Sequence, residues 1–192
     1  MGFFDSIFRK KIKPKDQPKV EKPTDLNPDE RFVQGFIEKG GKFLYCETEQ
    51  EVLGFLSNIL EENAWESMSW LDQDLNRFTS TLGLENNEGA QVFFTGCEHL
   101  IVEDSSLLFS SNQLKEIKLT HYPENFIVLA TTSQLLFTKD EGLTSIKYRF
   151  KKEIPTNISA IKDYMPHKKD PNFLNYGNMN SKNLYLLLLE DL

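Results

Sequence analysis

A group of four polar residues that could bind a ligand interrupts an otherwise apolar stretch of the sequence. The stretch IVEDSSLLFS, residues 101–110, places Glu103, Asp104, Ser105 and Ser106 between two apolar runs. Such carboxylates and hydroxyls cost little in a solvated turn between two strands. At the end of a strand, the same groups could instead hold a ligand at the rim of a pocket. The four residues alone leave both interpretations open.

Two histidines extend the set of candidate ligand-binding residues. His99 follows Glu98, and the two could act as an acid–base pair, with a surface histidine as the alternative. His121 precedes Tyr122-Pro123, a position typical of the loop before a strand, and is a candidate for the rim of a pocket. No Ser-His-Asp order and no glycine-rich phosphate loop accompanies them, so the sequence identifies no catalytic residue.

Cys46 and Cys97 are the two cysteines of the chain. Two thiols cannot make a four-cysteine zinc or iron–sulfur site, or a disulfide framework. Both stand beside aromatic or aliphatic residues, so we expect them to fill space in the core. The sequence also lacks the spacings typical of metal sites, and we therefore predict no metal and no cofactor.

The charge of the chain is divided unevenly. Residues 1–22 hold seven basic and three acidic residues, and the rest hold 15 basic and 26 acidic ones, which gives +4 and −11. An acidic body argues against nucleic acid as the main partner, because phosphate binding needs a basic face. No apolar run approaches the roughly 18 residues that span a bilayer, and no export signal is present. We therefore predict no transmembrane segment and a cytoplasmic location.

Residues 1–25 are predicted to form a separate basic, amphipathic and flexible tail. Phe3, Phe4, Ile7 and Phe8 recur at helical spacing, and a basic, proline-containing stretch follows them. Such a tail could dock to a partner or to an anionic membrane surface. The alternatives are a disordered tail and a segment that folds back on its own domain. We expect the tail to be dispensable for folding.

Residues 26–192 alternate between helix and strand patterns. Helices are predicted from Asn27 to Gly40, from Thr48 past Leu60, over 72–82 and within 133–149. Strands are predicted over 42–46, 65–70, 91–96, 106–110, 126–131, 157–161 and 184–189. Continuous apolar strands that alternate with helices predict one α/β domain, a mostly parallel sheet with helices on both faces.

The expected sheet also predicts where a ligand would bind. In open α/β sheets, ligands lie beyond the carboxyl ends of the strands. The strand predicted over 91–96 ends in Thr-Gly, and the next residues cross that edge before the following strand begins. We therefore expect Glu98, His99, Glu103 and Asp104 near this rim, which favours the ligand-binding interpretation of the polar group.

Three stretches carry a resemblance to a known family. They are FTGCEHLIVEDSSLLFSS (94–111), HYPENFIVLATTSQL (121–135) and IPTNISAI (154–161), with NLYLLLLEDL as the closing strand. From about residue 30 onward, the chain resembles the LUD (lactate utilization) family, whose members include the lactate utilization protein C subunit. The fold that this resemblance implies is similar to that of the NagB, RpiA and CoA-transferase group.

The resemblance also assigns positions. The family's glutamate falls on Glu103, its Thr-Gly-Thr run falls on Asp104, Ser105 and Ser106, and a frequent histidine falls on Asn125. Serine at 105 departs from the family's glycine, the residue that accepts positive φ freely. The predicted ligand-binding residues are Glu103, Asp104, Ser105, Ser106, His99, His121 and Asn125.

The function implied by the resemblance is that of an accessory subunit in the utilisation of L-lactate or a related organic acid. In this hypothesis, Glu103 orients a small organic acid or a partner, and iron–sulfur partner subunits carry the redox centres. One alternative is a CoA-transferase-like enzyme, in which Glu103 is the nucleophile of an acyl transfer. Another is an interaction protein that keeps the fold without catalysis. Whether the chain is an enzyme stays open.

Overall fold

The computed structural model describes residues 26–165 and 180–191, so the tail predicted over residues 1–25 lies outside the described residues. The helices are α2 (Pro28–Glu38), α3 (Glu49–Glu62), α4 (Asn76–Thr81), α5 (Ser111–Leu114) and α6 (Lys139–Arg149), with 3-10 turns η1 (Gln73–Leu75), η2 (Leu119–His121) and η3 (Thr132–Gln134). The strands are β1 (Lys42–Cys46), β2 (Met68–Ser69), β3 (Val92–Thr95), β4 (His99–Ile101), β5 (Ser106–Phe109), β6 (Asn125–Thr131), β7 (Leu135–Leu136), β8 (Ser159–Ile161) and β9 (Asn183–Leu189).

The central sheet has five strands in the order β1-β9-β6-β3-β2, and every neighbouring pair is parallel. This confirms the predicted α/β class and the mostly parallel sheet. β6 and β9 lie inside the sheet and pair over seven residues each. Both of their faces are covered, which explains why their sequences are continuously apolar rather than alternating.

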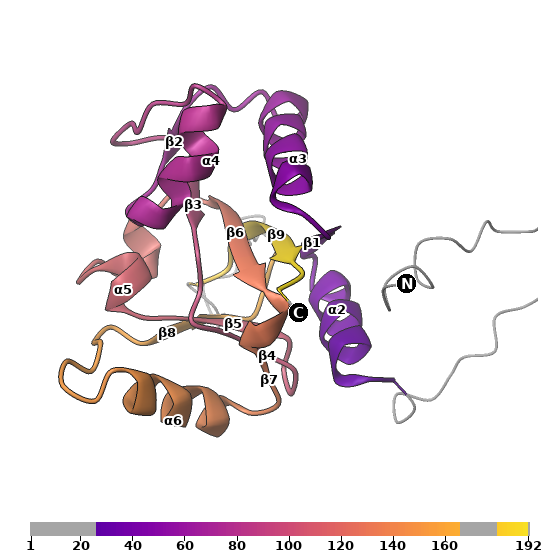
Figure 1. Cartoon of the computed structure of the whole chain (residues 1–192), viewed down its shortest axis with the longest axis vertical. Helices are drawn as coiled ribbons and strands as arrows, with labels where there is room; N and C mark the ends of the chain where they lie inside the picture. Colours follow the sequence, from indigo (N-terminus) through magenta and orange to yellow (C-terminus); the bar gives the residue numbers. More distant parts are fainter. Residues whose placement is uncertain (1–25, 166–179, 192) are drawn as a thin grey trace, which may run out of the picture.

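Two apolar cores lie on the two faces of this sheet. On one face, residues of α3 and α4, such as Leu56 and Phe78, pack against Phe94 and Ile127. On the other face, Phe36 of α2 packs in the core that contains Phe126 and residues of a second sheet. Figure 1 shows α3 and α4 above the central sheet, and the second sheet with α6 below it.

The second sheet was not predicted. Its order is β7-β4-β5-β8, with β5 antiparallel to both β4 and β8. The strands predicted over 106–110 and 157–161 exist, but they belong to this sheet, and β4 was not predicted. Together with α2, the second sheet covers the face where helices alone were expected.

The outer edge of β2 is covered by a short segment of the chain rather than by a strand. The backbone N–H of Asn87 donates to the carbonyl of Met68 at 3.1 Å. The side-chain amide of Asn86 accepts from the backbone N–H of Trp70 at 3.3 Å and donates to its carbonyl at 2.7 Å. Both backbone groups of Trp70 are thus satisfied by one side chain, which takes the place of a neighbouring strand.

Within residues 26–165 and 180–191, none of the helices combines the length and the apolar character needed to cross a lipid bilayer.

Candidate functional site

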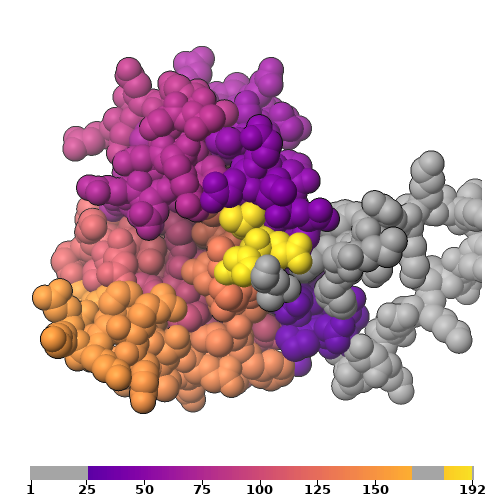
Figure 2. Space-filling view, viewed as in Figure 1, coloured from indigo at the N-terminus to yellow at the C-terminus, as the bar shows by residue number. Residues whose placement is uncertain are grey.

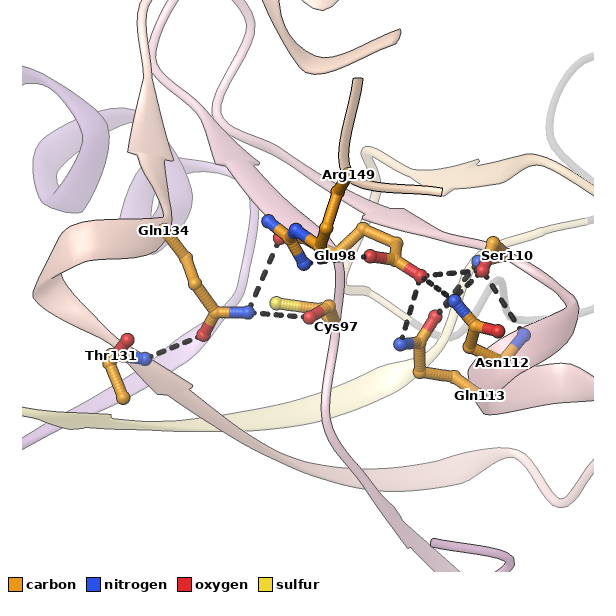
Figure 3. A network of polar contacts seen from close by, with 8 residues as sticks. All are labelled: Cys97, Glu98, Ser110, Asn112, Gln113, Thr131, Gln134 and Arg149. Carbon is orange, nitrogen blue, oxygen red and sulfur yellow. Dashed lines mark hydrogen bonds and ion pairs between the residues drawn. The ribbon is translucent and has the colours of Figure 1, made fainter. Parts of the chain in front are cut away.

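A network of polar contacts lies where β3 and β6 reach the carboxyl-end edge of the central sheet (Figure 3). Cys97 and Glu98 come directly after β3, and η3 comes directly after β6. The side-chain amide of Gln134 donates to the carbonyls of Cys97 at 2.6 Å and Glu98 at 3.3 Å. Its oxygen accepts from the backbone N–H of Thr131 at 2.7 Å. Gln134 therefore ties the ends of two parallel strands together.

Glu98 is the centre of this network and is 1% exposed. Its Oε1 accepts from Ser110 Oγ at 2.6 Å, Asn112 Nδ2 at 2.8 Å and Gln113 Nε2 at 3.2 Å. Its Oε2 accepts from Arg149 Nη1 at 3.4 Å. A buried carboxylate is costly unless donors surround it, and these four donors supply that environment. Arg149 remains half-exposed, so its guanidinium can also contact groups outside the protein.

His99 lies beside Glu98 and is 3% exposed, and apart from a weak contact with the Gln134 backbone neither ring nitrogen has a hydrogen-bond partner. The expectation of a surface histidine is therefore wrong, because β4 turns this side chain towards Gly142 of α6, where an added Cβ would lie 3.7 Å from the ring. Burial and the nearby positive Arg149 lower the pKa of His99, and the Gln134 backbone and Glu98 offset this in part. The ring is held neutral, but it does not form the predicted acid–base pair with Glu98.

The same edge holds a second carboxylate, after the end of β9. Asp191 accepts from Thr132 Oγ1 at 2.7 Å, and from the N–H and Oγ of Ser133 at 3.0 and 2.5 Å. Burial alone would raise the pKa of Asp191, but the hydrogen bonds from Ser133, Thr132 and Thr131 outweigh it and lower the pKa to about 2. Asp191 thereby fixes η3, which presents Gln134 to the loop after β3.

Glu103 and Asp104 lie in the turn of the β4–β5 hairpin, where Ile101 pairs with Ser106. The four polar residues thus form a hairpin turn, and the Glu103 side chain is exposed. The carboxylate that donors hold in this turn is that of Asp104 and not that of Glu103. Its Oδ2 lies 2.5 Å from Lys139 Nζ and its Oδ1 accepts from Ser106 Oγ at 2.5 Å.

The pKa of Asp104 reflects this environment. Burial alone would raise it, but the hydrogen bonds from Lys139 and Ser106 outweigh burial and lower the pKa. Lys162 Nζ lies 4.0 Å from the same carboxylate, and Lys39 Nζ donates to the Asp104 carbonyl. The turn is therefore fixed by lysines from three separate parts of the chain.

Ser105 has a left-handed backbone conformation and a buried side chain. Ser105 has φ +48°, so the backbone keeps the left-handed conformation that glycine adopts freely. The side chain is buried against α2, where a Cβ added to Gly35 would meet Ser105 Oγ at 2.2 Å. The carbonyl of Ser105 accepts from the buried Tyr164 hydroxyl at 2.6 Å. α2 and Tyr164 together hold the turn in a strained shape.

We expect Gly35→Ala to destabilise the protein by about 1–2 kcal/mol, because the cost of overpacking exceeds the gain in helix propensity. In a Ser105→Gly background the clash is removed, and the same substitution should become neutral or stabilising. Urea unfolding of the four proteins in this double-mutant cycle measures the coupling. Equal effects of Gly35→Ala in both backgrounds would show that the two residues do not interact.

The structure separates the other predicted residues from the hairpin turn. His121 lines a cavity of about 730 Å³, together with Trp70, Phe93 and Tyr122. The Asn125 side chain donates to the Gln91 carbonyl at 3.0 Å and accepts from Asn183 at 2.8 Å. Asn125 begins β6 and His121 precedes it, so both lie by the amino end of that strand, whereas the Glu98 network lies at the carboxyl end.

No group of three or more His, Cys, Asp or Glu side chains suited to a metal occurs among the residues that the structure describes. Cys46 and Cys97 are buried, as expected for core residues. Burial raises the pKa of the Cys46 thiol to about 12, and it also raises the pKa of Cys97. Neither thiol is poised to react as a thiolate near neutral pH.

The predicted ligand-binding residues do not include Glu98, Arg149, Gln134, Lys139 or Asp191. The signal for Glu98 was its place between a strand that ends in Thr-Gly and the apolar Leu100-Ile101. Nothing local in the sequence connects the other four to their partners, because each contact joins elements far apart along the chain.

Comparisons with known proteins bear on the fold. No family model matches the chain, and no curated protein matches it. A crystal structure of a DUF162 family protein from Deinococcus radiodurans is similar to this chain, with a TM-score of 0.60 and 14% sequence identity. The match covers 86% of this chain and 99% of that one. At this identity the likeness shows a shared α/β fold.

Proposed function

We propose that this chain is a LUD-domain accessory subunit in the utilisation of an organic acid, with L-lactate as the expected substrate of the system it serves. DUF162 is the older name of the LUD family, so the structural likeness and the sequence motifs support the same assignment. In this proposal the chain binds a metabolite or a partner, and iron–sulfur partner subunits carry the electrons.

The observation that carries the proposal is the exposed carboxylate of Glu103 on a turn that is otherwise rigidly held. Asp104, Ser105 and Ser106 are all fixed by neighbouring elements, whereas Glu103 faces solvent. A charged group on a fixed turn is suited to contact with another molecule, because little conformational entropy is lost on binding. The family position of this glutamate agrees with such a role.

The acyl-transfer alternative gains no support from this geometry. A carboxylate nucleophile needs a desolvated pocket flanked by donors, and Glu103 has neither burial nor a side-chain hydrogen bond among the described residues. The buried Glu98 has the donors, but its Oε1 already accepts three hydrogen bonds. The proposal therefore assigns binding, and not covalent catalysis, to this chain.

Deleting the gene in its source organism should abolish or slow growth on L-lactate as the sole carbon source, and the wild-type gene should restore it. We expect Glu103→Lys to fail in this complementation while the purified variant unfolds at the wild-type temperature. Glu85→Lys, which reverses an exposed charge in another loop, is the matched control and should restore growth. Full complementation by Glu103→Lys would contradict the assigned role of this residue.

Direct binding can be measured on the purified protein. If the ligand is a small carboxylate, L-lactate or pyruvate should raise the melting temperature of the wild type, and Glu103→Gln should change that shift. If the contact is to a partner subunit, both metabolites should leave the melting temperature unchanged, and Glu103→Gln should instead weaken co-purification with the iron–sulfur subunits. An equal response of both proteins in both assays would refute the role of Glu103.

A further inference from the structure

A hollow of about 340 Å³ lies between the edge strand β1 and helix α3. Five of its eight lining residues are apolar or aromatic and three are polar or charged: Phe43, Leu44, Phe55, Ile59 and Tyr185, with Lys42, Asn58 and Glu62. The Lys42 ammonium lies 4.4 Å from the centre of the Tyr185 ring, on the β1 side of the hollow. Leu44, Phe55 and Tyr185 are half-buried and pack on the core beneath, so part of each apolar surface faces the hollow. An apolar groove of this kind is suited to a small number of large apolar side chains.

The helix beside the groove is strongly acidic. α3 carries four glutamates and no lysine or arginine: Glu49, Glu51, Glu61 and Glu62. All four are exposed, and Glu49 forms an ion pair with Arg77 at 3.1 Å. Figure 2 shows α3 on the molecular surface, at the opposite end of the molecule from α6. The α3 side of the groove, away from Lys42, therefore favours a ligand that is apolar and positively charged.

We propose that residues 3–8 of this same chain dock in the groove, with residues 9–13 over the acidic surface of α3. The sequence FFDSIF offers four large apolar side chains at helical spacing. The sequence RKKIK that follows has four basic residues and no acidic one, which complements the four glutamates of α3. This inference goes beyond the proposed function and does not depend on it.

The length of the chain permits this contact. Twelve residues, 14–25, separate the basic sequence from Leu26, where the described structure begins, and they can span up to about 40 Å. α2 has 11 residues and is about 16 Å long, and β1 begins four residues after α2 ends. The 12-residue linker can therefore span more than the length of α2, which is about the distance from Leu26 back to β1.

Distances between two spin labels in the full-length protein test the proposal. Cys46 and Cys97 are buried, so labels attach to introduced cysteines. Ser6→Cys marks the segment, and Gly54→Cys marks α3 at a position where an added Cβ meets open space. Tyr148→Cys on α6, which is 72% exposed, is the control position.

For the label pair 6–54 we expect a narrow distribution of distances below about 20 Å, the length of α3. The pair 6–148 should give a longer distance.

Substitutions separate the apolar and the charged contributions. Phe4→Asp with Phe8→Asp should remove the short 6–54 distance. Glu61→Lys with Glu62→Lys should broaden it, and Glu85→Lys with Glu88→Lys, an exposed acidic pair elsewhere, should leave it unchanged. Added salt should broaden the distribution in the wild type, because the contact between opposite charges is screened.

Three outcomes would overturn the proposal. A broad distribution for the pair 6–54 in the wild type means that the groove does not hold this segment. A short distance that disappears on dilution with unlabelled protein means that a second copy supplies the segment. A label at position 6 that becomes immobile only on phosphatidylglycerol vesicles means that the segment binds a membrane surface instead.

Discussion

Glu98→Leu should lower the free energy of unfolding by about 2–4 kcal/mol, because it removes a buried carboxylate that several donors share. Leucine leaves the buried Ser110 hydroxyl and the half-buried Gln113 amide without their shared acceptor, and the exposed Asn112 amide loses the same partner. Each buried donor without a partner costs about 1–3 kcal/mol. The loss should appear as a lower urea midpoint with an unchanged m-value, because the native fold is kept.

Two further variants distinguish hydrogen bonding from ion pairing at Glu98. Glu98→Gln keeps one carbonyl oxygen for the three neutral donors, and we expect an intermediate loss. Arg149→Met removes the ion pair, but the half-exposed arginine contributes less than about 1 kcal/mol. The expected order of destabilisation is therefore Glu98→Leu, then Glu98→Gln, then Arg149→Met. A loss on Arg149→Met as large as that on Glu98→Leu would mean that charge pairing, and not the neutral donors, holds this carboxylate.

The stability of the protein should fall as the pH decreases below about 6.5, the ordinary pKa of a histidine in an unfolded chain, because His99 is buried in its neutral form. Its pKa is lowered in the folded state, so between the two pKa values the unfolded chain binds a proton that the folded protein does not. Over that range the free energy of unfolding decreases by up to about 1.4 kcal/mol per pH unit. Above pH 6.5 the effect vanishes, because His99 is neutral in both states.

His99→Leu should remove this pH dependence and raise the stability at pH 7 by about 1–3 kcal/mol, because two buried nitrogens without partners are replaced by apolar atoms. Urea unfolding at pH 5, 6 and 7 measures both effects. His121→Gln, which removes an exposed imidazole, is the control and should keep the wild-type pH dependence. If the free energy of unfolding of His99→Leu still decreases from pH 7 to pH 5, the pH dependence arises from another group.

His99 affects the stability at a higher pH than the hydrogen-bonded carboxylates do. Asp104 and Asp191 have lowered pKa values, so the stability they contribute is present above the unfolded value of 3.8 and is lost as the pH falls below it. For Asp191 this loss extends down to about pH 2. Measurements between pH 5 and 7 therefore report on His99 without these two aspartates.

The central sheet could be predicted from the sequence because its strands are long and continuously apolar. The strands predicted over 42–46, 126–131 and 184–189 agree with β1, β6 and β9 to within one residue. The second sheet could not, because β5 also pairs with β8, a segment about fifty residues away, as in Phe109 and Ser159. The strand pattern alone does not specify which sheet a short apolar segment joins.

The sequence identified candidate site residues by their type, but it could not predict which of them are buried. The residues around the hairpin were identified, but of its carboxylates Glu103 is exposed and Glu98 is buried. The difference arises because the turn directs Glu103 into solvent, whereas the loop after β3 directs Glu98 towards α5. His99 illustrates the same point, since only the position of α6 determines that its ring nitrogens lack partners. Such differences depend on tertiary packing, which adjacent residues do not encode.

The amide of Asn86 has a consequence for self-association. An unprotected sheet edge presents N–H and C=O groups to which a strand of another molecule can add, and such addition is a route to fibrils. At the β2 edge, Asn86 occupies both backbone groups of Trp70, and Asn87 occupies the carbonyl of Met68. A strand from another molecule would have to displace these contacts first. β2 has only two residues and is too short to protect its own edge. The segment that contains Asn86 and Asn87 therefore hinders aggregation at this edge.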